Sequence, residues 1–247
     1  MENTVPKLEY KMAFEEALDS YVISEHGKRV LAATPFIALS GVAGGGRNTV
    51  IRELVEKYNF VFAVSDTTRP PKLRDDRMEE NGVNYYFRTE EDILHDLQAG
   101  EYIEAEVIHN QQVSGISIRE LERVAATGKI PIRDFEYKGI KNVVLAKPDA
   151  TIIGIVPPSY EEWIRRFGER EKIHEQEFLN RLETAEKVLE NMLSQNYFKL
   201  VINDTVADCA KRVRNIAEFD IYPPEEEAEA RSVVTELLHR VQQALAE

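Results

Sequence analysis

Residues 41–49 read GVAGGGRNT, in which three consecutive glycines are followed by a cation and, two residues later, by a hydroxyl side chain. Glycine-rich turns between a strand and a helix bind phosphate because their backbone N–H groups and the helix N-terminus point at the anion. The stretch follows the pattern G-x-x-x-x-G-K-[ST], but Arg47 replaces the lysine and Asn48 replaces the serine or threonine. It therefore predicts a nucleotide-phosphate site with two altered residues.

The two altered residues change the chemistry of the loop in different ways. Arg47 keeps the positive charge and can hold a phosphate through two donors, but its side chain is longer and planar. Asn48 removes the hydroxyl group that normally contacts Mg²⁺, although its amide oxygen is still a suitable metal ligand. Thr49 supplies a hydroxyl one residue later, where we expect it to bind a phosphate oxygen. Phosphate binding is expected, whereas the rate of phosphoryl transfer stays open because that reaction depends on accurate positioning.

The elements that must position this loop are visible as short apolar runs rich in β-branched residues. Such runs predict strands buried on both faces of a parallel sheet, and they occupy residues 36–40, 60–65, 130–135, 150–156 and 198–203. Segments with helical spacing lie between most of them, at residues 49–58, 90–100, 117–128 and, longest, 160–195. Alternating strands and helices predict an α/β fold with a mainly parallel sheet flanked by helices.

Composition excludes several classes of function. A net charge of −13 argues against a nucleic-acid surface and requires an anionic substrate to find its cations locally. The only cysteine, Cys209, excludes an internal disulfide, and no Cys/His spacing indicates zinc. No apolar run approaches the ~20 residues of a membrane span, and the N-terminus lacks the core of a signal peptide. We expect a cytoplasmic protein without a nucleic-acid or membrane partner.

Six further segments follow the glycine loop in a fixed order. They are VSDTTRPPK (64–72), NGVNYYF (81–87), GEYIEAEVIHN (100–110), SGISIRELERVAATGKIPIRDFEYKG (114–139), VPPSYEEWIRRF (156–167) and VIND (201–204). Together they resemble the guanylate kinase family from about residue 36 to about residue 219. The fifth segment, for example, is similar to the family's P-P-S-x-x-x-L-x-x-R-L, with Trp163 at the leucine position. Each segment alone is only a modest match to the family, but six matches in the family's order are specific evidence for the resemblance.

The resemblance implies a P-loop kinase that converts ATP and GMP to ADP and GDP with Mg²⁺. It implies a GMP-binding subdomain at about residues 66–115 and a helical lid at about residues 160–185, within a domain spanning residues 35–220. The implied ATP-binding residues are Gly41, Val42, Ala43, Gly44, Gly45, Gly46, Arg47, Asn48, Thr49 and Asn203, with Asn48 also at the metal. The implied catalytic residues are Arg47, Arg170 and Arg181, the last two from the lid.

The same resemblance implies that the phosphate of GMP is bound by Arg69, Lys72 and Tyr85. The loop at residues 72–84 is a few residues longer than usual in the family, so Arg74 or Arg77 remain alternatives to Lys72. The family's second phosphate-binding tyrosine has no counterpart, because Val113 or Ser114 stands at its position. This gap weakens the predicted phosphate site by one hydrogen bond, or about 1 kcal/mol.

The resemblance implies that Ser65, Glu104 and Asp134 bind the guanine base. Glu136 follows Asp134 in the family's D-x-D spacing. A carboxylate suits guanine because the N1–H and the exocyclic amine form an edge of two donors, which adenine lacks. A hydroxyl residue of the family is replaced by Ile116, with Ser117 next to it.

Each of these residues also has a purely structural interpretation. Glu104 could belong to a solvated strand face with Glu106, and Asp134 could cap a strand or form an ion pair. The arginines at 165, 166, 170 and 181 lie among glutamates, where surface ion pairs are the ordinary outcome. Trp163 and Phe167 fit packing in the core or at the lid hinge better than stacking on a base.

Two other functions stay open at this point. Arg47, Asn48 and the missing tyrosine together are compatible with a non-catalytic guanylate-kinase-like module that binds a nucleotide or a protein. The altered loop at 72–84 is compatible with a kinase for another phosphorylated acceptor. Beyond the family segments, residues 1–34 predict an N-terminal helical extension and residues 221–247 an acidic linker with a C-terminal helix. Packing on the core, self-association and partner binding are all open for these flanks.

Overall fold

The computed structural model describes residues 7–74, 77–108, 110–168 and 175–246. The chain divides into two units. The first comprises Met1–Pro35, Phe62–Pro131 and Lys141–Asp149, and the second comprises Phe36–Val61, Ile132–Ile140 and Ala150–Glu247. The glycine loop belongs to the second unit, whereas the segment after it that carries Arg69 and Glu104 belongs to the first.

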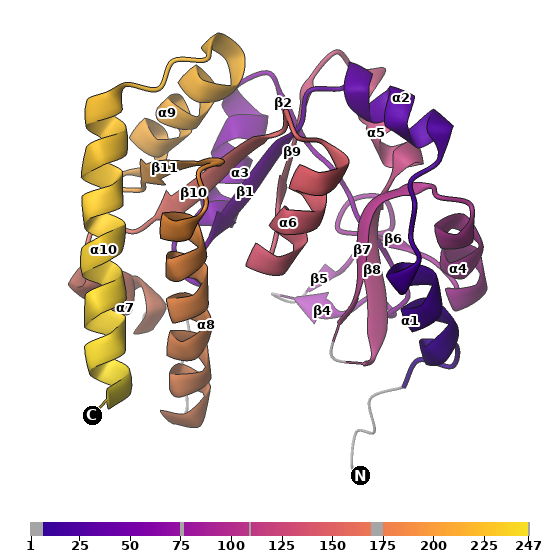
Figure 1. The fold of residues 1–247 in the computed structure, drawn as a ribbon, viewed down its shortest axis with the longest axis horizontal. Coiled ribbons are helices and arrows are strands. Elements are labelled where there is room, and N and C mark those ends of the chain that lie inside the picture. The colour runs from indigo at the N-terminus through magenta and orange to yellow at the C-terminus, as the bar shows by residue number, and fades with distance from the viewer. Residues whose placement is uncertain (1–6, 75–76, 109, 169–174, 247) are drawn as a thin grey trace. The chain divides into compact units, whose positions relative to one another are not determined.

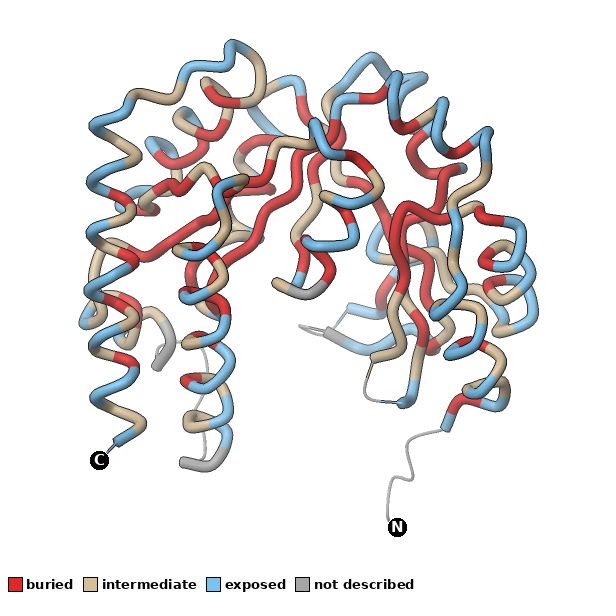
Figure 2. The backbone as a smooth tube through the Cα atoms, in the orientation of Figure 1, coloured by how far each residue is buried: buried red, intermediate tan, exposed pale blue. Residues whose placement is uncertain are grey.

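A sheet of five strands, in the order β11-β10-β1-β9-β2, forms the centre of the second unit. Its strands are β1 (Ile37–Gly41), β2 (Phe60–Phe62), β9 (Ile130–Asp134), β10 (Thr151–Val156) and β11 (Phe198–Ile202). β1 pairs in parallel with β10 and β9, and β10 with β11. All of β1 is buried, as Figure 2 shows, which confirms the prediction of parallel strands covered on both faces. Because these strands are parallel, the loops after them lie at one edge of the sheet.

Helices cover this sheet. They are α3 (Arg47–Lys57), α7 (Tyr160–Gly168), α8 (Glu175–Ser194), α9 (Val206–Phe219) and α10 (Pro224–Ala246), while α6 (Tyr137–Ala146) passes from the second unit into the first. The predicted helix at 160–195 is described as α7 and α8, and residues 169–174 lie outside the described residues. Helices α8 and α10 run side by side (Figure 1).

The acidic run after Tyr222 differs from the prediction of a linker. Pro224 is the first residue of α10, and Glu225, Glu226 and Glu227 form its first turn. Proline at the first helical position loses no hydrogen bond, and carboxylates there interact favourably with the helix dipole. The buried face of α10 contains Ala230, Val234, Leu237 and Val241.

The first unit is built on a sheet of four strands in the order β6-β3-β8-β7. The strands are β3 (Asp66–Thr67), β6 (Tyr86–Phe87), β7 (Tyr102–Ile108) and β8 (Gln112–Ser117); a separate hairpin joins β4 (Leu73–Arg74) to β5 (Arg77–Met78). Its helices are α1 (Lys11–Asp19), α2 (Glu25–Ala33), α4 (Glu90–Gln98) and α5 (Ile118–Ala125). The predicted strand at 60–65 ends at Phe62, and β3 then belongs to this second sheet.

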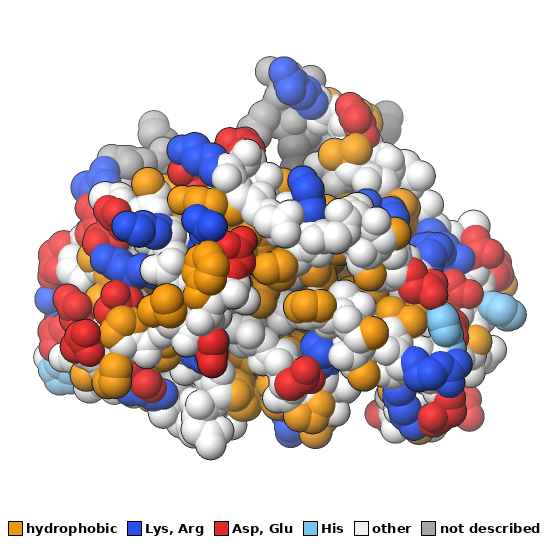
Figure 3. Space-filling view, turned by 90° about the horizontal axis from the view of Figure 1, so that it is seen from above, with side chains coloured by type: hydrophobic (Ala, Val, Ile, Leu, Met, Phe, Trp, Pro, Cys, Tyr) orange, Lys and Arg blue, Asp and Glu red, His pale blue; other side chains and the backbone are white. Residues whose placement is uncertain are grey.

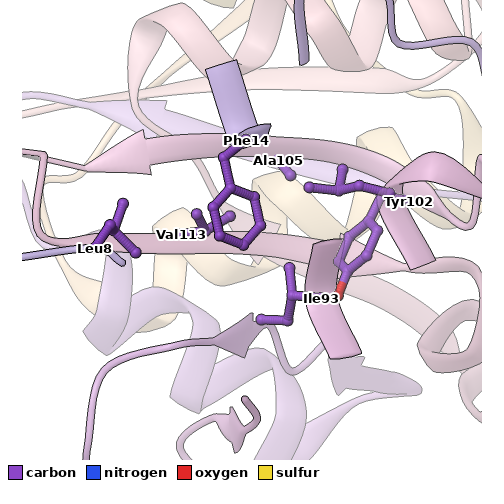
Figure 4. Packing of buried hydrophobic residues seen from close by; sticks show 7 residues of the cluster. Leu8, Phe14, Ile93, Tyr102, Ala105 and Val113 are labelled. Carbon is purple, nitrogen blue, oxygen red and sulfur yellow. The ribbon is translucent and has the colours of Figure 1, made fainter. Parts of the chain in front are cut away.

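The N-terminal segment is part of the first unit and contains two helices where the sequence predicted one. Between them, the Ser24 side chain caps α2 by accepting from Gly27 N at 2.9 Å, and Ser24 N donates to Gly100 O at 2.9 Å. Phe14 packs with Ile93 and Val113 in a buried cluster shown in Figure 4. The first flank therefore belongs to the core of the unit that contains Glu104. Among the described helices, none is apolar over a length that would cross a bilayer.

Candidate active site

The glycine loop connects β1 to α3, as the sequence predicts, and its glycines are required by close contacts. A Cβ on Gly41 would lie 2.4 Å from the carbonyl oxygen of Ile155. Gly46 has a left-handed backbone with a φ of +96°, and a Cβ there would lie 2.1 Å from Nδ2 of Asn203. The carbonyl of Gly46 then accepts from Thr49 N and Val50 N, which begins the helix. The loop thus ends at a helix N-terminus, where an anion is favoured.

Arg47 lies at the carboxyl end of the neighbouring strand β9. Its Nη1 donates to the carbonyl of Phe135 at 3.2 Å and lies 4.0 Å from Oδ2 of Asp134. The Arg47 side chain is 16% exposed, and that of Asp134 is 27% exposed. Asn48 is exposed on the first turn of α3, and Glu136 is exposed just beyond β9. The Arg47 guanidinium is therefore held by the end of β9.

Two side chains from other elements hold the carbonyls of the loop. Asn203, after β11, donates from Nδ2 to Gly45 O at 2.9 Å, while its Oδ1 is buried without a hydrogen-bond partner among the described residues. Trp163 on α7 is 1% exposed and donates from Nε1 to Ala43 O at 2.7 Å. Asn203 was predicted at this site. Trp163 was predicted as packing only, and no sequence signal reports where its N–H points.

The arginines near the predicted lid are paired with glutamates. Arg165 and Arg166 each donate to Glu162 at 2.7 Å, which lowers the pKa of that carboxyl to about 2. Arg166 also donates to Asn203 O at 2.9 Å and to Asp204 O at 3.2 Å. Arg181 on α8 pairs with Glu177 one turn earlier. Arg170 lies outside the described residues.

Asp204, which follows Asn203, is held ionised by Arg212. Burial alone would raise the pKa of Asp204, but the hydrogen bonds from Arg212 and from Thr205 N lower it overall. Elsewhere on the surface, acidic and basic side chains are interspersed over the face in Figure 3. The described residues contain no group of three or more His, Cys, Asp or Glu that could hold a metal ion.

In the first unit, Arg69 is fixed by Glu79. The two side chains are only 7% and 3% exposed. Nη1 of Arg69 donates to Oε2 of Glu79 at 2.5 Å, and Nη2 donates to Oε1 at 2.9 Å. The Tyr85 ring lies against the guanidinium, with 4.7 Å from Cζ to the ring centre. Arg69 and Tyr85 are thus brought together as predicted, whereas the role of Glu79 was not anticipated.

The remaining predicted phosphate cations are more open. Lys72 is exposed, but its backbone closes the base of the hairpin, since Lys72 N donates to Glu79 Oε2 and Glu79 N donates to Lys72 O. Arg77 is exposed on β5, and the side chain of Arg74 lies outside the described residues. Where the family pattern has a second tyrosine, Val113 is in the core and the Ser114 hydroxyl donates to Asp66 O at 2.9 Å.

The predicted guanine-reading residues of the first unit, Ser65 and Glu104, are both buried. The interpretation of Glu104 as part of a solvated strand face is therefore wrong, because Glu104 is only 9% exposed at its position on β7. Ile116 is also buried, and the neighbouring Ser117 hydroxyl caps α5. Asp134 belongs to the second unit, where it lies near Arg47 and Arg133.

Comparisons with known proteins agree with this arrangement. A sequence model of the guanylate kinase family matches residues 33–219. Guanylate kinase 1 of Arabidopsis thaliana is 32% identical over 187 residues, which are 74% of this chain and 47% of that protein. The guanylate kinase of Clostridium perfringens SM101 is 32% identical over 182 residues, which are 73% of this chain and 81% of that protein. The chain thus spans about half the length of the Arabidopsis relative.

A solved structure shows the same fold. The crystal structure of guanylate kinase from Anaplasma phagocytophilum superposes with a TM-score of 0.55 at 24% identity and covers 84% of this chain and 94% of its own. The family match includes the glycine loop, β9, α7 and β11, and it leaves α10 and most of the N-terminal flank outside. On the extent of this match, the chain belongs to the guanylate kinase family.

Proposed function

We propose that this protein transfers the γ-phosphoryl group of ATP to GMP and releases ADP and GDP. The observation that carries the proposal is the glycine loop with Arg47 at the carboxyl edge of the parallel sheet, in a chain of this family. An oxygen of the GMP phosphate forms the new bond to the γ-phosphorus as the bond to the β–γ bridging oxygen breaks. Catalysis of this kind is mainly positioning and charge stabilisation, and no covalent intermediate is needed.

On the donor side, the loop from Gly41 to Thr49 would bind the phosphates of ATP through backbone N–H groups. Arg47 would turn from the carbonyl of Phe135 to the phosphate oxygens, because a guanidinium binds an anionic phosphate more strongly than a neutral carbonyl. The unpaired Oδ1 of Asn203 would accept from an N–H donor such as the exocyclic amine of adenine. These contacts would stabilise the charge that develops during transfer.

Asn48 fits a role at the metal. Its side chain is exposed at the start of α3, and an amide oxygen is among the ligands that Mg²⁺ accepts. Mg²⁺ typically keeps several waters and takes only one or two protein ligands beside substrate phosphates. When bound, the ion would neutralise phosphate charge. The protein's contribution would be to fix the side chain of Asn48 next to the loop.

On the acceptor side, Arg69, Lys72 and Tyr85 would hold the phosphate of GMP. The pairing of Arg69 with Glu79 supports this role, because the guanidinium is held in one orientation before the ligand arrives. Ser65, Glu104, Asp134 and Glu136 would read the guanine edge. Arg170 and Arg181 would neutralise the transferring phosphoryl group, in the lid role that the family resemblance implies.

A matched pair of variants tests the acceptor. Glu104 and Glu106 are neighbours of the same type on β7, and Glu104 is the more buried of the two. ADP release is measured with ATP, Mg²⁺ and GMP, and in parallel with AMP, UMP and dTMP. We expect turnover with GMP alone, a loss of at least tenfold in kcat/KM for Glu104→Gln, and less than twofold for Glu106→Gln. Equal rates of ADP release with AMP and with GMP would overturn the proposed selection of guanine. No ADP release with any acceptor would overturn the proposed function.

A further inference from the structure

Trp163 occupies a position where the family pattern has leucine, and it brings a hydrogen-bond donor there. It is the only tryptophan of the chain, and its buried indole N–H donates to Ala43 O at 2.7 Å. Leucine at this position would fill space without holding the loop. Ala43 lies in the first half of the glycine loop, so α7 makes a polar contact with this part of the loop.

The planar peptide converts this contact into an orientation of the next N–H group. In a trans peptide the C=O and the N–H point in opposite directions within one plane. Fixing the carbonyl of Ala43 toward Trp163 therefore fixes the N–H of Gly44 on the opposite side. The bond from Asn203 to Gly45 O does the same for the N–H of Gly46. Two carbonyls held by side chains thus orient two N–H groups of the loop.

Trp163 is itself supported by the C-terminal helix. The Tyr160 ring meets the Trp163 ring edge-on, with 5.9 Å between centres. Arg240 on α10 lies over the Tyr160 ring at 4.8 Å and donates to Glu161 at 2.6 Å. Helices α7 and α10 belong to the same unit and contact each other (brown and yellow in Figure 1), and α10 lies beyond the family match. A flank outside the family match thus contacts the helix that holds the loop.

We propose that Trp163 is a positioning residue of the glycine loop, which orients the N–H of Gly44 toward the donor phosphates, and that α10 supports it through Arg240. This inference rests on the proposed binding of ATP at the loop. It assigns to Trp163, which binds a carbonyl of the loop, an effect on the binding of ATP and not on that of GMP. Replacing Trp163 with Phe keeps an aromatic ring and removes the indole N–H. The expected effect on ATP binding is therefore the loss of one oriented hydrogen bond.

Calorimetric titration with ATP and Mg²⁺ tests the proposal on four proteins. We expect Trp163→Phe to raise the ATP Kd about five- to tenfold. In the ADP-release assay, its KM for GMP should change less than twofold. Arg240→Ala should raise the ATP Kd about twofold, since its contacts are partly exposed. The control is Tyr222→Phe, which removes hydrogen bonds of 2.8 and 3.0 Å to Leu200 in the same unit, and its ATP Kd should stay native.

The outcomes separate this inference from the proposed function. An ATP Kd of Trp163→Phe equal to that of the native protein overturns the inference alone, and a native value in Arg240→Ala overturns the part given to α10. No ATP binding by the native protein overturns both. If Trp163→Phe fails to fold, the tryptophan fluorescence of the native protein tests the proposal instead. Saturating ATP, but not GMP, must change the emission of the single indole, and unchanged emission overturns the proposal.

Discussion

The ion pair with Glu79 fixes the side chain of Arg69, which we propose as a ligand of the GMP phosphate. Burying a guanidinium is costly unless a carboxylate binds it with good geometry, and here two parallel hydrogen bonds do so. The hydrogen bonds that Arg69 donates to Glu79 also raise the pKa of Arg69 further above its usual value. The acceptor phosphate would therefore meet a cation whose orientation is already set.

Removing one partner of this pair should be costly. We expect Glu79→Ala to lower the free energy of unfolding by about 3 kcal/mol, because a buried guanidinium loses its counter-ion. The neighbouring Glu80→Ala is the control, since the Glu80 side chain is exposed and should matter by less than about 0.5 kcal/mol. Urea unfolding of both variants measures the difference, and equal midpoints would contradict the importance of the pair.

Gly46 should tolerate no side chain, for two separable reasons. Its left-handed backbone strains alanine by about 1–2 kcal/mol, and a Cβ would also collide with Asn203. We expect Gly46→Ala to raise the ATP Kd at least tenfold. Gly128 also has a positive φ, of +68°, but a Cβ there meets nothing within 4 Å. Gly128→Ala should thus lose stability with native ATP binding. An unaffected Kd in Gly46→Ala would argue against the loop as the donor site.

The residues that could be predicted from the sequence were those defined by local patterns. The glycine loop, Arg47, Arg69 and Asn203 all follow short motifs. The bond of Trp163 to Ala43 joins residues far apart in the chain, and whether the indole N–H points to the loop or to the core depends on packing. Glu79 was missed for a similar reason. A glutamate in a lengthened polar loop indicates solvent exposure unless the position of Arg69 is known.

Among the secondary-structure elements, the strands of the larger sheet and helices α3, α4 and α5 could be predicted because their apolar periodicity is strong. The break between α1 and α2 could not, because Ser24 N pairs with Gly100 O across 76 positions. The run Pro-Pro-Glu-Glu-Glu indicates both a solvated linker and a helix N-terminus. Only the packing of the following apolar face, with Ala230 and Val234 buried, decides for the helix.

Adjacent leucines test whether α10 is an integral element. Leu237 is 1% exposed, whereas Leu238 is only partly covered. We expect Leu237→Ala to lower the free energy of unfolding by about 3 kcal/mol and Leu238→Ala by less than about 1 kcal/mol. Chemical denaturation of the two variants gives the comparison. If both cost equally little, the C-terminal helix does not contribute its apolar face to the core of the second unit.

For the whole molecule, buried weak acids predict how stability depends on pH. Burial raises the pKa of the Cys209 thiol to about 12, whereas an unfolded thiol titrates near ~8.5. The folded protein therefore keeps a proton that the unfolded chain releases. This contribution to stability is complete below the unfolded pKa and is lost as pH rises toward the folded one.

The alkaline loss of stability should depend on Cys209. Between pH 8 and pH 10 we expect the native protein to lose roughly 2 kcal/mol more unfolding free energy than Cys209→Ala. Denaturant unfolding of both proteins at the two pH values measures this difference. Tyr222, whose pKa burial also raises to about 12, contributes equally in both proteins and cancels. Parallel losses in the two proteins would show that the thiol is not held protonated by the fold.

The central claim is that the altered loop supports phosphoryl transfer to GMP. The most direct measurement is ADP release from ATP, Mg²⁺ and GMP by the native protein, beside the variant that carries Arg47→Lys and Asn48→Ser together. We expect turnover by the native protein with GMP, and turnover by the double variant with the same acceptor preference. A native protein without activity beside an active double variant would contradict the account. It would mean that Arg47 and Asn48 disable the donor loop while the acceptor site remains intact.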